Sequence, residues 1–181
     1  MALCHTLVLS FFVFIFPTVA RLVNVTIDDF NPAIQYAPAG NNQWTARTQD
    51  CDSCTTAPDV TQVYNHTWHD ATYDFYIKEQ SAPETLAIRF NGTAIYAYGI
   101  LSTLASQTAD MYMFIDDFYN PVANFKFNGS DPDGSGSYIY NALLYSNTSL
   151  PPGEHSFLLQ NGQGGGGLTS LILFDYLIYT T

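Results

Sequence analysis

Residues 85–100 have the sequence TLAIRFNGTAIYAYGI, and this stretch decides the fold class. In residues 85–90 (TLAIRF), large apolar side chains alternate with smaller or polar ones. This is the period of a β-strand with one buried face. Asn91-Gly92 is a turn signal, and residues 93–100 (TAIYAYGI) continue the β-rich pattern. The stretch therefore predicts two β-strands separated by a turn.

Similar segments recur along the chain, with Pro and Gly between them. We expect further strands at residues 22–28, 110–116, 122–127, 138–145, 155–160 and 169–179. Residues 29–67 are less regular, so we expect a long loop with short strands there, and Gly164 to Gly167 predict a flexible hairpin loop. No segment after residue 20 has sustained helical periodicity. The pattern predicts an all-β fold, a β-sandwich or jelly roll, and leaves a barrel as the alternative.

The first twenty residues predict export. Residues 7–16 (LVLSFFVFIF) form an apolar run that ends at Pro17 and is followed by small residues up to Ala20. This is the layout of a secretory signal peptide, and the run is too short to span a membrane. We therefore expect a signal peptide at residues 1–20, one domain at residues 21–181, a secreted, extracellular protein, and no membrane span in the mature chain.

Composition and charge exclude some partners. The formal net charge is −11, and the chain has only five basic residues, which form no patch. Nucleic acid and anionic membrane surfaces would be repelled, so neither is an expected partner. An apolar content of 47% argues against disorder. The sequence leaves the oligomeric state open.

Five N-x-S/T sequons fit a secreted glycoprotein, because N-glycosylation acceptors lie on exposed parts of secreted chains. The predicted sites are Asn24, Asn65, Asn91, Asn128 and Asn147.

Cys51 and Cys54 are the two cysteines that remain after the predicted signal peptide. In an oxidising compartment such a close pair predicts a small-loop disulfide. Together with His66 and His69 the two cysteines also approach zinc-finger spacing, although both gaps are short and the intervening segment is poor helix material. The disulfide is the favoured interpretation and a zinc site the alternative.

Residues 131–136 (DPDGSG) match the first half of an EF-hand loop, with candidate calcium ligands at Asp131, Asp133 and Ser135. The carboxylate expected at position twelve is replaced by Ala142, so a structural calcium is an alternative to a polar turn. No cofactor is otherwise predicted. Catalysis has no recognisable motif, since the chain lacks both a G-x-S-x-G nucleophile and a recognisable pair of catalytic carboxylates.

Exposed aromatic residues beside polar groups are candidate sugar-binding residues. Trp44 and Trp68 could stack on a pyranose, and His69 and Asp70 follow Trp68 directly. Strand alternation would place Trp68 and Asp70 on one face and His69 on the other. The competing interpretation is that Trp68 belongs to the core.

Several segments together resemble a family of uncharacterised secreted or membrane-anchored proteins of mushroom-forming fungi. The similar segments are FNGTAIYAYG at 90–99, VTIDD at 25–29, TWHD at 67–70, LPPGEH at 150–155 and LFDYLIYT at 173–180. These proteins carry galactose-binding-like domains, so the resemblance implies a jelly-roll sandwich and, by analogy of fold, carbohydrate or cell-surface binding. Many relatives continue into a linker and a transmembrane helix, whereas this chain stops at Thr181. We therefore expect a truncated or purely secreted form.

The leading functional hypothesis is an extracellular module that binds carbohydrate, such as that of a cell wall. A small secreted glycan-active enzyme and a structural or adhesive surface protein without a small ligand are the alternatives. An enzyme predicts a cleft with convergent carboxylates, and a binding module predicts a shallow groove with an exposed aromatic ring.

Overall fold

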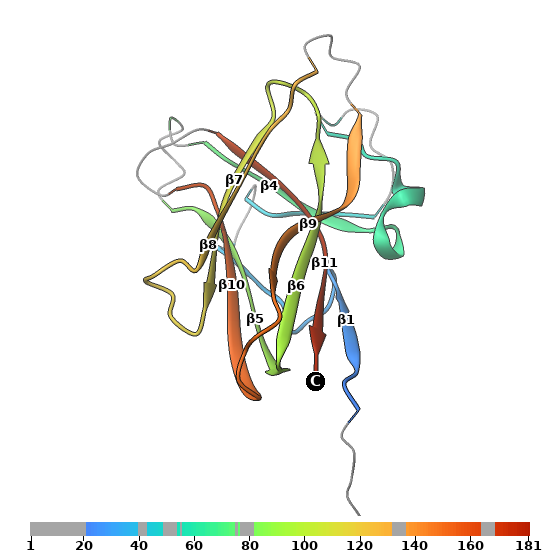
Figure 1. The fold of residues 1–181 in the computed structure, drawn as a ribbon. Coiled ribbons are helices and arrows are strands. Elements are labelled where there is room, and N and C mark those ends of the chain that lie inside the picture. The colour runs from blue at the N-terminus through green and yellow to red at the C-terminus, as the bar shows by residue number, and fades with distance from the viewer. Residues whose placement is uncertain are drawn as a thin grey trace, which may run out of the picture.

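The protein forms two antiparallel sheets packed face to face. The structure is a computed structural model that describes residues 21–39, 43–48, 54, 56–74, 76, 82–131, 137–163 and 169–181. The six-stranded sheet contains β1 (Asn24–Asp28), β3 (Thr45–Arg47), β4 (Trp68–Tyr73), β6 (Ala94–Ser102), β9 (Tyr138–Asn147) and β11 (Ser170–Thr180). The five-stranded sheet contains β2 (Gln35–Ala37), β5 (Glu84–Gly92), β7 (Thr108–Ile115), β8 (Ala123–Asn128) and β10 (Gly153–Asn161). Figure 1 shows the two sheets from one side of the molecule.

In the six-stranded sheet, β1 and β4 share one edge of β11. The strand order is β3-β4-β11-β6-β9, and β1 pairs with β11 off that path. β4 pairs with the first half of β11, up to Phe174, and β1 pairs with the second half, from Tyr176. Asp175 therefore lies where the two partners meet, and the register of β11 against β6 shifts at the same point.

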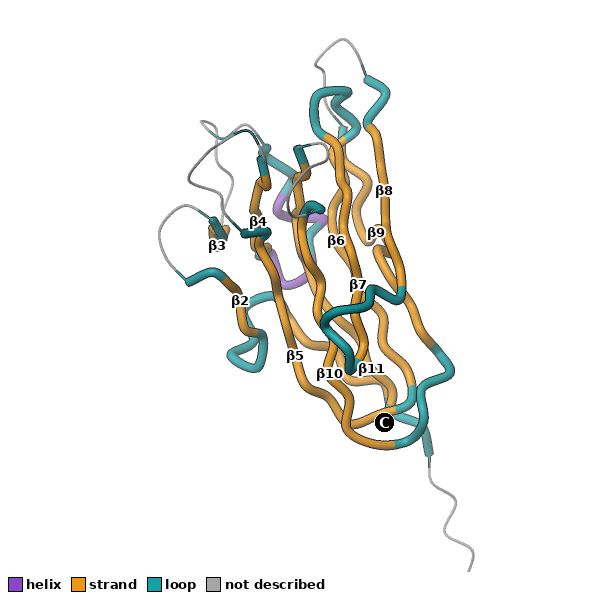
Figure 2. The backbone as a smooth tube through the Cα atoms, turned by 90° about the vertical axis from the view of Figure 1, so that its left-hand side faces the viewer, coloured by secondary structure: helices purple, strands orange, loops and turns teal. Residues whose placement is uncertain are grey.

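The five-stranded sheet has the order β2-β5-β10-β7-β8. Figure 2 looks onto this sheet and shows the loop between β7 and β8 crossing in front of the strands. The described segment at residues 116–122 makes up that loop. It therefore projects from the outer face of the sheet.

Most connections cross from one sheet to the other, which is the connectivity of a jelly roll. The bend at Thr93 is one of them, so β5 and β6 do not pair with each other but belong to opposite sheets. The expected turn residues Asn91 and Gly92 are instead the last two residues of β5, paired with Glu154 and Gly153. Gly92 is needed there, because a Cβ atom on it would collide with the carbonyl oxygen of Thr180. The next backbone N–H, that of Thr93, donates to this oxygen at 2.8 Å. The bend is thereby fixed against the end of β11.

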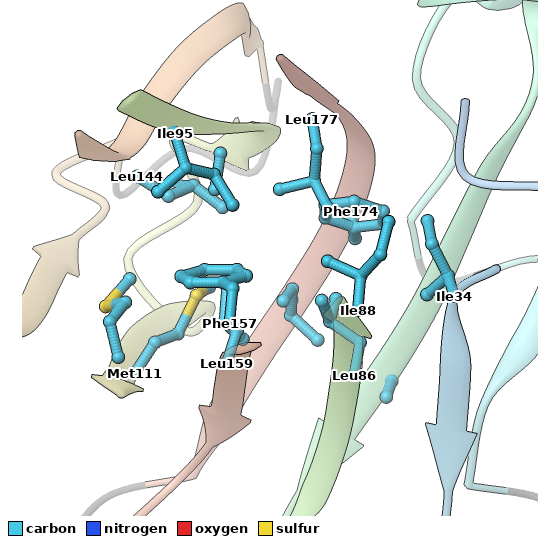
Figure 3. Close-up of a cluster of buried hydrophobic side chains, with 14 of the residues drawn as sticks. Ile34, Leu86, Ile88, Ile95, Met111, Leu144, Phe157, Leu159, Phe174 and Leu177 are labelled. Atoms are coloured by element: carbon cyan, nitrogen blue, oxygen red, sulfur yellow. The ribbon is translucent and has the colours of Figure 1, made fainter. Parts of the chain in front are cut away.

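The core fills the space between the two sheets (Figure 3). Alternation in β5 points Leu86, Ile88 and Phe90 inward, and Phe157 of β10 and Phe174 of β11 are fully buried. Apolar surface removed from water contributes about 25 cal/mol per Å², so these large side chains dominate the stability of the sandwich.

A second, smaller cluster lies on the outer face of the six-stranded sheet. Residues 56–67 contain two short 3₁₀ turns, η1 (Val60–Gln62) and η2 (Tyr64–His66), on the right-hand side of Figure 1. Val63 from this segment packs with Trp68, Ile100 and Leu173. The segment thus covers part of the sheet that would otherwise face water.

The expected all-β, jelly-roll type of sandwich is confirmed. Each of the eight strands expected from the sequence corresponds to an observed strand, with ends that differ by a few residues. These are β1 and β5 to β11. The expected loop at residues 29–67 contains β2 and β3, as short strands. The run from Gly164 to Gly167 lies outside the described residues.

Candidate functional site

The structure places Trp68 in the core rather than on the surface. Its side chain has no exposed area and lies between β4 and the covering segment at 56–67. A stacking platform must show one ring face to the ligand, so the expectation of Trp68 as a sugar platform is wrong. The competing interpretation, a core residue, fits its burial.

Asp70 lies on the same outer face as Trp68 and is also buried. Its carboxylate accepts a hydrogen bond from Nε of Arg47 at 2.9 Å. Burial raises the pKa of Asp70, while the hydrogen bond and charge of Arg47 oppose the rise. Asp70 is therefore the partner of Arg47 and holds β3 to β4.

His69 points to the opposite face, as the alternation predicts. Its Nδ1 lies 2.6 Å from Oδ2 of the fully buried Asp29, and its ring stacks on Tyr36 with centroids 4.2 Å apart. Thr67 Oγ1 donates to the other oxygen of Asp29 at 2.6 Å. Burial raises the pKa of Asp29, and these two partners lower it. This network ties β1 and β4 together inside the sandwich.

Trp44 is half-buried against the same network. Its ring lies 4.9 Å from that of Tyr36, and Nε1 donates to the carbonyl of Ala37 at 3.1 Å. Trp44 and Trp68 are thus on different faces of the six-stranded sheet, with His69 on one and Asp70 on the other. The four residues do not converge on one binding surface.

The predicted metal and disulfide sites are only partly covered by the structure. Asp131 forms a bridge with Leu104 through backbone hydrogen bonds, while Asp133 and Ser135 lie outside the described residues. Within the described part of the chain, no group of three metal-ligating side chains gathers. Cys51 also lies outside, so the pairing with Cys54 and the calcium loop stay predictions.

The predicted glycosylation sites have suitable positions. Four of the sequon asparagines are exposed and the fifth is half-buried. The exposed ones are Asn24, Asn65, Asn91 and Asn128, and the half-buried one is Asn147. Glycosylation itself stays a prediction.

A groove runs over the outer face of the five-stranded sheet and, beyond Arg89, reaches the edge of the sandwich at Tyr179 of β11. One hollow, of about 400 Å³, is lined by Ala33, Gln35, Ala87, Ile88, Arg89, Phe118 and Ser156. A second, of about 470 Å³, is lined by Arg89, Phe90, Asn91, Glu154, His155, Ser156 and Tyr179. Because Arg89 and Ser156 line both, we treat the two hollows together as the groove. Ligand sites in proteins have volumes of this order.

Three strands supply the polar floor of the groove. Gln35 of β2 is opposite Ala87 of β5, and Arg89 of β5 is opposite Ser156 of β10. Side chains two residues apart on a strand share a face, so Ala87 and Arg89 point outward together while Leu86 and Ile88 fill the core. The sheet therefore holds Gln35, Arg89 and Ser156 on one rigid surface.

Phe118 forms an aromatic wall of the groove from the β7–β8 loop. Its side chain is 47% exposed. The loop is held by Asp117, which accepts hydrogen bonds from the backbone N–H of Tyr119 at 2.8 Å and from Asn120 at 2.6 Å. A half-exposed ring beside polar groups is what a sugar ring requires, since its apolar face can stack while its hydroxyls bond the polar groups.

A buried histidine fixes the start of that loop. His155 Nδ1 lies 2.7 Å from Oδ2 of Asp116, and its Nε2 lies 2.7 Å from the carbonyl of Pro151. The backbone N–H of Ser156 donates to Oδ1 of Asp116 at 2.7 Å. Burial acts to raise the pKa of Asp116, but these hydrogen bonds lower it overall. Asp116 also has φ of +60°, a strained conformation that the surrounding bonds maintain.

The contacts of His69 and His155 do not support a role for either residue in acid–base catalysis. Both ring nitrogens of His155 face acceptors, and the ring of His69 stacks on Tyr36 inside the sandwich and does not line the groove. A general base needs a free nitrogen near the reacting proton and a nucleophile within hydrogen-bond reach. Within the described residues, no hydrogen bond joins either ring to a Ser, Thr or Cys side chain.

The groove was missed by sequence reasoning, which chose the two tryptophans. One signal was present: Arg89 is the charged outward position of the alternating TLAIRF segment. Phe118 had no comparable signal, because only the folded β7–β8 loop brings it to β5 and β2.

No family model and no curated protein matches the sequence of this chain. Among solved structures, it is similar to a family 35 carbohydrate-binding module from Clostridium thermocellum, with 10% identity, coverage of 86% of this chain and 96% of that one, and a TM-score of 0.46. It is also similar to the CBM36-1 domain of a multidomain xylanase from the hindgut metagenome of Trinervitermes trinervoides, with 11% identity, coverage of 87% and 96%, and a TM-score of 0.42.

A third similar structure is a family two carbohydrate esterase from Cellvibrio japonicus, with 13% identity and a TM-score of 0.44. The match covers 88% of this chain but 34% of the esterase. At this level of identity the likeness concerns the fold alone. In the described part of the chain, no helix is long and apolar enough to cross a membrane.

Proposed function

We propose that this protein is a secreted module that binds carbohydrate in the groove of its five-stranded sheet. The observation that carries the proposal is the combination of the half-exposed Phe118 with Gln35, Arg89 and Ser156 around one hollow. The ring supplies a stacking surface, and the polar side chains supply partners for hydroxyl groups. The signal-like segment at residues 1–20 supports an extracellular location.

The groove suits binding better than turnover. Its polar floor is set on paired strands, so little ordering is needed when a ligand binds, which favours affinity. The nearest carboxylates of the loop, Asp116 and Asp117, already accept hydrogen bonds from the protein. They are therefore occupied in holding Phe118. Glu154 is then the one carboxylate among the residues that line the groove, whereas an acid–base pair needs two.

The test is a binding screen of the secreted protein against plant, fungal and bacterial polysaccharides, followed by titration of the best ligand. Phe118→Ala should weaken binding about five- to thirtyfold without changing the melting temperature, because truncating an aromatic anchor of a binding site costs about 1–2 kcal/mol. Tyr119→Ala is the matched control, since Tyr119 is in the same loop and 94% exposed but does not line the groove.

Equal binding by wild type and Phe118→Ala would place the site elsewhere. No binding to any polysaccharide would favour the structural or adhesive alternative.

A further inference from the structure

Arg89 carries a positive charge that no described residue neutralises. Two other basic side chains have partners: Arg47 is 2.9 Å from Asp70, and Lys126 is 3.2 Å from Asp110. Arg89 is exposed and forms no hydrogen bond or ion pair with any residue that the structure describes. Its guanidinium is thus a free donor in a chain whose net charge is −11.

The carboxylates around Arg89 do not compensate it. Asp116 is engaged by His155 and by the backbone of Ser156, and Asp117 by the backbone of Tyr119 and by Asn120. Glu154 lines the second hollow together with Arg89, yet the two form no ion pair within 4 Å. The groove therefore contains one unpaired cation between an aromatic wall and polar side chains.

We infer that Arg89 binds the carboxylate of an acidic sugar, so that the ligand of the groove is a glycan containing uronic acid. This inference rests on the proposed function. The planar guanidinium donates two parallel N–H bonds that match a carboxylate, and such charge-assisted pairs are about twice as strong as neutral hydrogen bonds. A neutral hydroxyl would use only part of this donor set.

The first hollow can hold a sugar ring against Phe118 and its carboxylate against Arg89 at the same time. Phe118 and Arg89 both line the first hollow, so a pyranose stacked on the ring can direct its carboxylate toward β5. The overall negative charge acts against an acidic ligand at long range. At physiological ionic strength this repulsion is screened beyond about 8 Å, so the charges inside the groove decide the preference. Glu154 lines the second hollow and not the first, so in the first hollow Arg89 is the charged residue that meets the ligand.

The experiment compares tetragalacturonic acid with its fully methyl-esterified form, which keeps the sugar rings and removes the charges. Isothermal titration with wild type should give about five- to tenfold tighter binding of the acid, since hydrogen bonds to charged groups contribute about 1 kcal/mol more than neutral ones. Arg89→Gln should remove this preference while it leaves the affinity for the ester within about twofold of wild type. Arg89→Lys, which keeps the charge and loses the planar fork, should retain only part of the preference.

Lys126→Gln is the matched control, because it makes the same change in net charge on the same sheet without touching the groove. A preference for the acid that survives in Arg89→Gln would overturn the inference, and so would equal binding of acid and ester by wild type. Tighter binding of a sulfated oligosaccharide than of the uronate would also overturn it.

The outcome for the proposed function is separate. If neutral glycans bind in a Phe118-dependent way and the acid does not, only the role of Arg89 fails. If no glycan of any charge binds, the proposed function fails as well.

Discussion

His155 and Asp116 form an ion pair in which the ring Nδ1 is 2.7 Å from the carboxylate Oδ2, and the second ring nitrogen donates to Pro151. Both nitrogens face acceptors, so the ring fits its contacts only as the imidazolium cation. The pair joins β10 to the first residue of the loop that carries Phe118. Protonation of one buried ring is therefore coupled to the shape of the groove.

We expect a pH-dependent loss of stability from His155. The carbonyl of Pro151 and the carboxylate of Asp116 raise its pKa above 6.5 in the folded protein. A raised pKa means that this contribution is complete below pH 6.5 and is lost as the pH rises through the folded value. Proton NMR titration of the imidazole should show a pKa above 6.5, and a value at or below it would contradict the prediction.

Asp116→Asn separates charge from shape in this pair. Asn tolerates the left-handed backbone at position 116 and keeps the size of the side chain, so mainly the charge is lost. The pKa of His155 should fall, and the melting temperature at pH 5 should fall with it. An unchanged pKa of His155 in this variant would mean that the charge of Asp116 does not stabilise the imidazolium.

Asp175 should make the protein less stable as the pH approaches neutrality. Burial raises its pKa to about 7, and the charges of Asp29 and Asp28 add to the rise. The folded state then binds more protons than the unfolded state between about pH 4 and 7. In that window Asp175 lowers the free energy of unfolding by about 1.4 kcal/mol per pH unit. Urea denaturation at several pH values measures this slope.

The neutral variant Asp175→Asn should be more stable than wild type at pH 7.5 and should have a flatter pH profile between pH 4 and 7. The backbone N–H of Tyr64 donates to Oδ2 of Asp175, and the amide oxygen of Asn can accept the same bond. A variant that loses stability at pH 7.5 would show that the carboxylate charge is stabilising here.

Trp68→Ala should lower the melting temperature sharply. The side chain is fully buried beside Val63, Ile100 and Leu173, and a large-to-small change in such a place costs about 3–5 kcal/mol. Binding to any glycan, measured below the new melting temperature, should be unchanged because the groove is on the other sheet. An unchanged melting temperature together with lost glycan binding would instead show that Trp68 contributes to binding.

Trp68→Phe should cost less than its loss of volume suggests. Nε1 of Trp68 is buried without a hydrogen-bond partner, and an unpaired buried N–H costs about 1–3 kcal/mol. Phenylalanine removes that N–H together with part of the ring, so the two effects oppose each other. Thermal denaturation of both variants side by side tests this.

A glycan on Asn91 should weaken binding in the groove. Asn91 lines the second hollow and is two residues from Arg89 on the outward face of β5, a distance of about 7 Å along the strand. Asn91→Gln should therefore bind polysaccharide more tightly than wild type when both are produced with glycans. Asn128→Gln removes a sequon from β8 on the same sheet, does not line the groove, and should have no effect.

Alternation predicted the positions of eight of the eleven strands, because apolar residues at every second position must share one buried face. It missed β4, in which both faces carry buried residues. It could not predict which strands pair. Asn91-Gly92 predicts a turn, but both residues belong to β5, and the chain bends at Thr93 instead. There the backbone contacts Thr180, far away in the chain, and crosses to the other sheet.

The candidate site was harder to predict because its aromatic residue acts through tertiary structure. Trp68 and Phe118 are both aromatic residues near acidic ones in the sequence. Trp68 is buried since residues 56–67 fold over it, whereas Phe118 is exposed since its loop leaves the sheet. No local sequence pattern predicts that residues 56–67 cover Trp68 or that the β7–β8 loop leaves the sheet.

A short sequence recurs in two places where a strand ends. Residues 27–30 and 115–118 are both IDDF, and both follow the end of a strand or end it. In each copy one Asp accepts a bond from a histidine, Asp29 from His69 and Asp116 from His155. The bonded Asp is the third residue of the first copy and the second residue of the other, so the two copies are similar in composition but not equivalent in structure.

The pairing of β1 with β11 also has a mechanical consequence. Val23 and Thr181 exchange backbone hydrogen bonds of 2.9 Å in both directions, and Asn24 is opposite Thr180. A force that pulled these two points apart would act across the ladder and load its hydrogen bonds one after another, as in a zipper. The sandwich should therefore yield at low force in this direction and resist far better when strained along its strands, where many bonds would break together.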